Sequence, residues 1–246
     1  MERLMEELMN KGASLVGFGK VQGLYRDCNL SDSKTIDSEK QYFKIPEYPY
    51  GISIAIKIPK EIVRGISKGP TIDYYNTYHE INQKLDELVL FCEEYLIDLG
   101  YNAYAQTGHR SKEYGNFNTV MPHKTVAVAA GIGWIGKSAL LVTKQFGSAV
   151  RLTSILTDAP LKYSEEMIDV PCQNCMICKK ACPGGAITGH VWDKNKDRDW
   201  IFNALACRKA AREIAYKEIK KEITLCGKCI EVCPYTRKYL ECEITK

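Results

Sequence analysis

The cysteines constrain this sequence more than any other feature. The chain has eleven, and nine of them lie between Cys172 and Cys242, whereas Cys28 and Cys92 are the only two in the first 171 residues. No apolar run reaches the roughly 18 residues that span a bilayer, and the N-terminal MERLMEELMNKG lacks a secretory h-region. We therefore expect a cytoplasmic protein, in which cysteines are metal ligands more often than disulfides. The sequence therefore predicts two parts with different chemistry, and the boundary between them lies near Pro171.

Two runs of cysteines have the spacing of a bacterial ferredoxin. The first reads C-x-x-C-x-x-C-x-x-x-C and the second C-x-x-C-x-x-x-C, and a proline follows each run. Two-residue gaps wrap the backbone tightly around one face of a cluster, and the fourth cysteine of a run ligates the other cluster in two-cluster ferredoxins. The second run lacks its first cysteine, and Cys207, which lies between the runs, can replace it.

This crossover predicts two [4Fe–4S] clusters held by eight cysteines. The first cluster takes Cys172, Cys175, Cys178 and Cys233, and the second takes Cys182, Cys207, Cys226 and Cys229. Zinc is the alternative, but four-cysteine zinc sites usually combine two separated C-x-x-C pairs, without a third close cysteine or the C-P pair. Cys28, Cys92 and Cys242 are left without a ligand role, since Cys92 falls on the apolar face of a predicted helix and Cys242 lies near the end of the chain.

The part before the cysteines reads as an α+β layer domain, which we assign to residues 1–165, with the cysteine-rich domain at 166–246. Apolar residues recur at three or four positions over 73–99, from Tyr75 to Leu99, and Gly100 follows where helices commonly end. An opening helix and four short apolar stretches complete the pattern, with strands predicted at 13–18, 52–58, 101–105 and 149–157. Strands mixed with helices, without a regular βαβ alternation, are typical of the α+β class.

Residues 131–138, GIGWIGKS, match two nucleotide-binding motifs, the phosphate loop G-x-x-x-x-G-K-S and the dinucleotide motif G-x-G-x-x-G. Either motif requires a strand before the loop and a helix after it, whereas Pro122 and Gly131 bracket the preceding segment as the start and end of a helix. The dinucleotide motif also needs an acid about 20 residues further on, where Arg151 stands. We expect these glycines either to let the backbone approach another bulky ligand or to make a tight crossing.

Taken together, the glycine-rich segment and the cysteines resemble the epoxyqueuosine reductase family, which are cobalamin-dependent iron–sulfur enzymes related to reductive dehalogenases. The resemblance rests on AAGIGWIGKSALLVTKQFGSAVRLTSILTDAPL, CQNCMICKKACPGGAI, the isolated Cys207 and CGKCIEVCP. It implies a nitroreductase-like α+β domain that binds a corrinoid, followed by a ferredoxin-like double [4Fe–4S] domain. The same eight cysteines carry over as cluster ligands, and the cofactor-binding residues would be Gly131, Gly133, Trp134, Gly136, Lys137 and Ser138.

This resemblance implies an iron–sulfur oxidoreductase in which two clusters, reduced by ferredoxin or flavodoxin, deliver electrons to cobalamin. Family members place an acidic proton donor and then an E-R pair upstream of the glycine-rich segment. Here the stretch reads NFNTVMPHK, with His123 and Lys124 at the pair and no carboxylate near Phe117. The chain also ends soon after Cys233, without the helical repeats that help full-length members to hold tRNA. We therefore expect a shorter relative that reduces a small molecule, and neither epoxyqueuosine in tRNA nor another nucleic acid as its partner.

Histidine and tyrosine are the candidates for the missing proton donor. His123 ends a polar, glycine-containing stretch, and Tyr75 belongs to a group of tyrosines ahead of the glycine-rich segment. Helix packing is the alternative role for any one of these tyrosines. A second hypothesis is an electron-transfer protein that reduces a corrinoid or flavin on a partner, without substrate chemistry of its own. A cofactor held tightly by the chain itself distinguishes the first hypothesis from the second.

Overall fold

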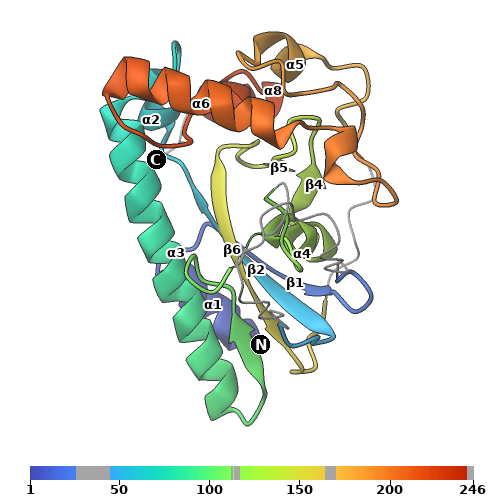
Figure 1. The fold of residues 1–246 in the computed structure, drawn as a ribbon. Coiled ribbons are helices and arrows are strands. Elements are labelled where there is room, and N and C mark those ends of the chain that lie inside the picture. The colour runs from blue at the N-terminus through green and yellow to red at the C-terminus, as the bar shows by residue number, and fades with distance from the viewer. Residues whose placement is uncertain (26–44, 112, 114–116, 164–169, 243–246) are drawn as a thin grey trace, which may run out of the picture. The chain divides into compact units, whose positions relative to one another are not determined.

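The computed structural model describes residues 1–25, 45–111, 113, 117–163 and 170–242 (Figure 1). The helices are α1 (Glu2–Asn10), α2 (Lys60–Gly65), α3 (Ile72–Asp98), α4 (His123–Ala129), α5 (Ile177–Ala181), α6 (Ala204–Ile219), α7 (Lys228–Glu231) and α8 (Pro234–Glu241), with a 3₁₀ turn at Arg198–Trp200. The strands are β1 (Leu15–Lys20), β2 (Tyr50–Lys57), β3 (Ala103–Ala105), β4 (Gly133–Ile135), β5 (Leu141–Thr143) and β6 (Val150–Thr157). The fold class is α+β, as the sequence predicts.

The chain forms two compact units, each assembled from three separate stretches. The first unit comprises Met1–Ala55, Lys84–Ile132 and Leu152–Glu166, and the second comprises Ile56–Gln83, Gly133–Arg151 and Met167–Lys246. The second unit therefore contains both the cysteine runs and the strands of the glycine-rich segment. Within the described ranges, no helix is both long and apolar enough to cross a membrane.

A four-stranded sheet has the order β1-β2-β6-β3, in which β1 pairs antiparallel with β2 and β3 pairs antiparallel with β6. All four strands overlap the stretches predicted from the sequence, although β1 begins two residues later than expected. Central strand β2 is buried on both faces, since Ile52, Ile54 and the intervening Ser53 are all 0% exposed. This explains why the residues that alternate with the isoleucines of β2 are small ones, Gly51, Ser53 and Ala55, rather than charged ones.

Glycines in β1 allow the end of helix α4 to lie directly against this strand. A Cβ atom on Gly17 would lie 2.6 Å from the carbonyl oxygen of Ala130, and one on Gly19 would lie 2.5 Å from the carbonyl carbon of Ala129. Neither distance leaves room for a side chain, so the G-F-G sequence of this strand is a packing requirement.

Helix α4 ends in a Schellman motif, a common glycine-dependent helix terminus. Gly131 takes a φ of +69°, its N–H donates to the carbonyl of Val128, and the N–H of Ile132 donates to the carbonyl of Ala127. The predicted helix end at Gly131 is thus confirmed, while Pro122 is the N-cap rather than the first helical residue. Because a helix precedes Gly131, the segment does not have the strand–loop–helix context of a phosphate loop.

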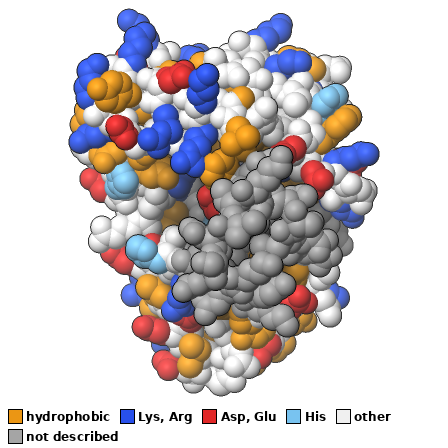
Figure 2. Space-filling model, in the orientation of Figure 1, with side chains coloured by type: hydrophobic (Ala, Val, Ile, Leu, Met, Phe, Trp, Pro, Cys, Tyr) orange, Lys and Arg blue, Asp and Glu red, His pale blue; other side chains and the backbone are white. Residues whose placement is uncertain are grey.

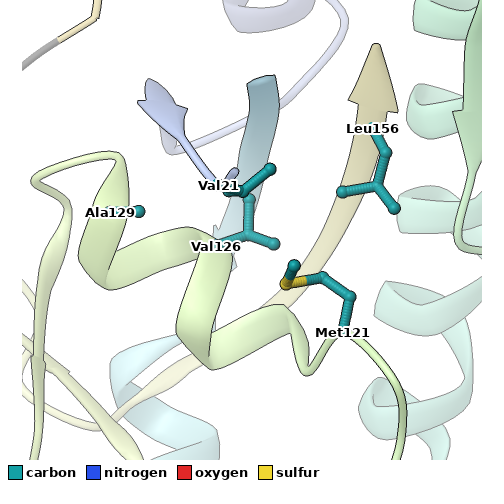
Figure 3. Close-up of a cluster of buried hydrophobic side chains, with 5 residues drawn as sticks. All are labelled: Val21, Met121, Val126, Ala129 and Leu156. Atoms are coloured by element: carbon teal, nitrogen blue, oxygen red, sulfur yellow. The ribbon is translucent and has the colours of Figure 1, made fainter. Parts of the chain in front are cut away.

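A cluster of buried side chains fixes α4 against the sheet (Figure 3). Its members are Val21, Met121, Val126, Ala129 and Leu156, none more than 6% exposed. Full burial of a valine, leucine or methionine side chain stabilises a fold by about 1.5–3 kcal/mol. This packing holds the first turn of α4, and with it the backbone of His123, in a defined position.

Helix α3 matches the predicted long helix, because it ends at Asp98 and Gly100 follows with a φ of +86°. Its buried face runs through Tyr74, Ile81, Leu85, Leu88 and Cys92. The prediction that Leu99 shares this face is wrong, since Leu99 is 55% exposed, and Tyr75 is only half-buried. A spacing of three or four residues does not fix which apolar residues of such a long helix face the core near its two ends, because the apolar face drifts around the helix axis.

Cys92 is expected to resist alkylation in the native protein. Burial, and to a lesser extent the charge of Glu93, raises the pKa of Cys92 to about 12, so the thiol stays protonated at pH 8, and the thiolate is the nucleophile. Iodoacetamide followed by peptide mass mapping should modify the exposed Cys242 at least about 100-fold faster than Cys92. Equal rates at the two cysteines would contradict this burial.

The second unit contains a hairpin of β4 and β5, which the sequence did not predict because each strand has only three residues. Trp134 in β4 is 1% exposed, and its ring lies edge-on to that of Tyr235 with centroids 4.8 Å apart. The N–H of Ser148 donates to Oγ1 of Thr236 over 3.0 Å. The residues that follow Cys233 are therefore fixed against this hairpin and the turn after it.

Candidate iron–sulfur centres

The eight cysteines predicted to be cluster ligands all belong to the second unit, and short helices position several of them. Cys178 lies in α5 and Cys229 in α7, and these two helices contact each other. Cys207 lies in the first turn of α6. Cys233 is the N-cap of α8 and Pro234 opens that helix, so the chain turns away after the cysteine as the C-P pair predicts.

Five cysteines line one cavity of about 230 Å³. The cavity is lined by Cys172, Cys175, Cys178 and Cys233, the four predicted for the first cluster, together with Cys229. Burial, followed by the charges of the neighbouring Cys172, Cys175 and Cys233, raises the pKa of Cys178 to about 11. The structure thus brings together the four cysteines that the ferredoxin crossover groups as the first set.

The remaining four predicted ligands form a second group. Burial, followed by the charges of Cys182 and Cys226, raises the pKa of Cys207 to about 11. Burial also raises the pKa of Cys229, with Cys226 and Cys207 as its strongest charged neighbours and Cys178 of the first group as the next. Cys229 also lines the cavity of the first group, so the two groups adjoin at this residue.

The donor set fits [4Fe–4S] clusters, which bind four cysteine thiolates each and supply the storage and transfer of single electrons when bound. A Cβ atom on Gly136 would lie 2.9 Å from Cγ2 of Val142 and 3.6 Å from Sγ of Cys172, so glycine keeps this side of the cavity open. Because the thiol pKa values of Cys178 and Cys207 are raised, cluster binding must release protons and is favoured as the pH rises. In the described part of the chain, no three His, Cys, Asp or Glu side chains lie close enough to share a single metal ion.

The glycine-rich segment contributes to the same cavity only through its second half. Gly136, Lys137 and Ser138 line the cavity, whereas Gly131 ends α4 and Trp134 packs in the hairpin. A Cβ atom on Gly133 would collide with the carbonyl oxygen of Val142 in the facing strand. Thus one half of the segment is shaped by packing, and the other half faces the cysteines.

Two lining residues, Tyr235 and Lys238, were not predicted as part of a site. Burial raises the pKa of Tyr235, and the charges of Cys172 and Cys233 act in the same direction. Nζ of Lys238 lies 5.4 Å from the ring centroid of Tyr235. Their positions in the sequence could have indicated this, because Tyr235 directly follows the C-P pair and Lys238 lies one helical turn after Pro234.

His123 lies in the first unit, at the first residue of α4. Its Nδ1 is 2.8 Å from Oγ of Ser154, and Nε2 of Gln106 donates to the same hydroxyl over 2.7 Å. Ser154 and Gln106 are buried, while the histidine is half-buried. Gln106 and Ser154 thus form a series of hydrogen bonds that ends at the imidazole of His123 and orients it.

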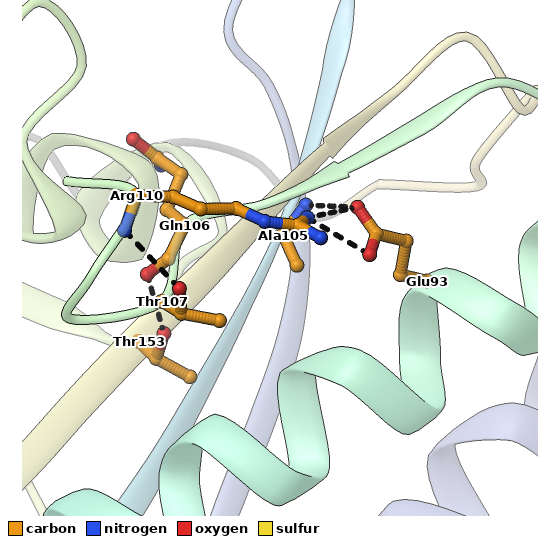
Figure 4. A network of polar contacts seen from close by, with 6 residues as sticks. All are labelled: Glu93, Ala105, Gln106, Thr107, Arg110 and Thr153. Carbon is orange, nitrogen blue, oxygen red and sulfur yellow. Dashed lines mark hydrogen bonds and ion pairs between the residues drawn. The ribbon is translucent and has the colours of Figure 1, made fainter.

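That network continues at the end of β3 (Figure 4). Oγ1 of Thr153 donates to the carbonyl of Gln106 over 3.2 Å. Glu93 accepts from the N–H of Ala105 over 2.8 Å and from Nη1 of Arg110 over 2.7 Å. A half-exposed ion pair of this kind contributes about 0–1 kcal/mol, so its main effect is to fix the turn that follows β3.

The second predicted proton donor, Tyr75, lies in the second unit, outside the lining of the cysteine cavity. Its ring packs edge-on against that of His79 with centroids 4.6 Å apart, and Nζ of Lys221 lies 5.4 Å from its centroid. His123 and Tyr75 therefore belong to different units. Cys28 lies outside the described residues.

Known proteins that resemble this chain include iron–sulfur proteins with two clusters. Residues 171–236, which span all eight cysteines, match the family described as a 4Fe-4S double cluster binding domain. The epoxyqueuosine reductase of Listeria monocytogenes is 32% identical over 167 residues, an alignment that covers 68% of this chain and 39% of that protein. The chain thus matches about two fifths of the length of this curated relative.

Two kinds of solved structure share the fold. A reductive dehalogenase, whose structure is described as suggesting a mechanism for B12-dependent dehalogenation, has a TM-score of 0.63 and 19% identity, over 92% of this chain and 30% of that one. An epoxyqueuosine reductase in complex with a modified tRNA-Tyr stem loop has a TM-score of 0.59 and 22% identity, over 96% of this chain and 65% of that one. The 32% identity to the Listeria enzyme, the matched double-cluster domain and the cysteine pattern together show that the chain belongs to the epoxyqueuosine reductase-like family of double [4Fe–4S] cluster proteins.

Proposed function

We propose that this protein is an iron–sulfur oxidoreductase that passes single electrons through two adjoining clusters to a cobalamin, which reduces a substrate. The observation that carries the proposal is the cavity that is lined by Cys172, Cys175, Cys178, Cys229 and Cys233. We assign residues 166–246 to cluster binding and residues 1–165 to the corrinoid and the substrate. The proposed ligands are Cys172, Cys175, Cys178 and Cys233 for one cluster and Cys182, Cys207, Cys226 and Cys229 for the other.

The corrinoid part of the proposal is supported by the α+β fold shared with a reductive dehalogenase described as B12-dependent. For the proton that a reduction consumes, we propose His123, because its hydrogen bond to Ser154 fixes the ring while the residue stays partly accessible. Tyr75 is the second candidate, since this residue is also only partly buried. The similarity to a tRNA-bound reductase makes epoxyqueuosine in tRNA a substrate to test beside small molecules.

The partner that we propose is an acidic electron donor such as ferredoxin or flavodoxin. Lys and Arg side chains gather over α6 (Figures 1 and 2). The exposed ones include Arg208, Lys209, Lys217 and Lys220, with Glu213 and Glu218 among them. Complementary charge accelerates association of such proteins at low salt, and Cys207 lies on the same helix.

Cobalamin binding is the direct test of this proposal. The anaerobically reconstituted protein, incubated with excess cobalamin and separated by gel filtration, is expected to carry a corrin absorption band and about one cobalt per chain. A parallel incubation with FMN serves as the control, because the visible spectra of flavin and corrin differ. Reduction assays with an epoxyqueuosine-containing stem loop and with a halogenated phenol then identify the substrate class. Loss of all corrin from protein with intact clusters would contradict the proposal and indicate an electron-transfer protein that acts on a partner's cofactor.

A further inference from the structure

Lys137 is a buried cation beside the first group of cysteines. It is 3% exposed, and its Nζ donates to the carbonyl oxygen of Gln173 over 2.5 Å and lies 3.8 Å from Sδ of Met176. Both partners belong to the cysteine run itself, since Gln173 follows Cys172 and Met176 follows Cys175. The lysine therefore connects the hairpin to the backbone that carries the first cluster ligands.

The charge of Lys137 has no counter-charge among the described side chains, because none of the ion pairs formed there includes this residue. Burial of a cation without a counter-charge is strongly unfavourable. A neutral carbonyl and a thioether satisfy its hydrogen bonds only in part. The cavity that Lys137 lines is also lined by five cysteines, and the four of them proposed as ligands of the first cluster become thiolates when they bind it. A negatively charged cluster is therefore the missing counter-charge.

We infer that Lys137 is a positioning residue for the cluster held by Cys172, Cys175, Cys178 and Cys233, and that its charge raises the reduction potential of this cluster. This inference rests on the proposed ligand assignment. Reduction adds one negative charge to a cluster, and a nearby cation in a dry site favours the more negative state.

The nucleotide-like sequence G-K-S has a different explanation in this setting. A phosphate loop presents its lysine at the start of a helix, whereas Lys137 lies between strands β4 and β5. Its Nζ is directed at the cysteine run and not at an open anion site. The lysine and the adjacent Gly136 thus serve one cavity, Gly136 by leaving space and Lys137 by supplying charge.

The test compares Lys137→Gln, which removes the charge, with Lys137→Arg, which keeps it, in the reconstituted full chain. Iron content is measured first, and each cluster is then titrated under EPR, with the signal lost in Cys175→Ala marking the first cluster. At a fixed potential, Lys137→Gln is expected to lower the ratio of reduced to oxidised first cluster at least tenfold, which is 59 mV for one electron, and to leave the second cluster unchanged. Lys137→Arg should stay close to wild type. Lys144→Gln is the matched control, since this exposed lysine follows β5 in the same unit but does not line the cavity, and its charge is screened by solvent.

The outcomes separate the inference from the proposed function. If Lys137→Gln loses one cluster while Lys137→Arg keeps both, the charge is needed to hold the cluster, which supports the inference. An unchanged potential in Lys137→Gln with full iron content, or loss of the cluster in both variants, would overturn it. Failure of the wild-type chain to bind two clusters would instead overturn the proposed function.

Discussion

Replacing Cys207 with alanine is expected to remove one whole cluster, so that the iron content of reconstituted protein falls from eight atoms per chain, two clusters of four, to about four. Cys207 lies on α6, apart from both cysteine runs, yet its strongest charged neighbours are Cys182 and Cys226 of the second group. A cluster with three thiolates is labile, because each ligand contributes to a binding free energy that also orders the chain. Cys207 is not among the proposed ligands of the first cluster, so this cluster should remain.

Cys242→Ala is the matched control for this experiment. Cys242 is exposed at the end of α8 and has no place in either group, so its removal should leave eight iron atoms. Iron and acid-labile sulfide analysis measures both variants, and EPR of the reduced protein shows which signal is lost. A Cys207→Ala protein that retains eight iron atoms would show that another residue supplies the fourth ligand.

Gly147→Ala is expected to destabilise the second unit by about 2–5 kcal/mol. Gly147 has a φ of +58°, and a Cβ atom there would collide with the backbone nitrogen of Thr236 and lie 2.5 Å from its Cα. The left-handed conformation costs alanine about 1–2 kcal/mol, and forcing an atom into a packed contact adds about 1–3 kcal/mol. The obstacle is backbone that leads directly from Cys233, so it cannot move without displacing a predicted ligand.

Gly185→Ala separates these two costs. Gly185 has the same φ of +58° and lies in the same unit, but a Cβ atom there meets nothing within 4 Å. Its replacement should therefore cost only the conformational part, about 1–2 kcal/mol. Urea unfolding of the cluster-loaded proteins measures the difference. Equal destabilisation by the two substitutions would show that the contact between Gly147 and Thr236 is not tight.

The parts of this protein that local sequence encodes were predictable. Spacing alone predicts that Cys172, Cys175, Cys178 and Cys233 lie together, and all four line one cavity, because two-residue gaps and a following proline describe the wrapping of backbone around a cluster. Glycine marks the ends of α3 and α4 for a similarly local reason, since Gly100 and Gly131 take the left-handed conformation that ends a helix.

What was not predictable depends on residues far apart in the chain. Each compact unit is assembled from three separate stretches, so the hairpin of β4 and β5 joins cysteines that begin about thirty residues later. The burial of Lys137 follows from that long-range contact, as does the place of Tyr235 and Lys238 in the lining of the cysteine cavity. Strands of three residues also carry too short a pattern to be recognised.

The central claim, that eight cysteines hold two [4Fe–4S] clusters, is tested most directly by metal analysis of the anaerobically reconstituted wild-type chain. Iron, acid-labile sulfide and zinc are measured on the same sample, and Mössbauer spectroscopy identifies the cluster type. The account predicts eight iron atoms and eight sulfides per chain, all in [4Fe–4S] clusters, with no bound zinc. Four or fewer iron atoms per chain, or stoichiometric zinc in place of iron, would contradict it.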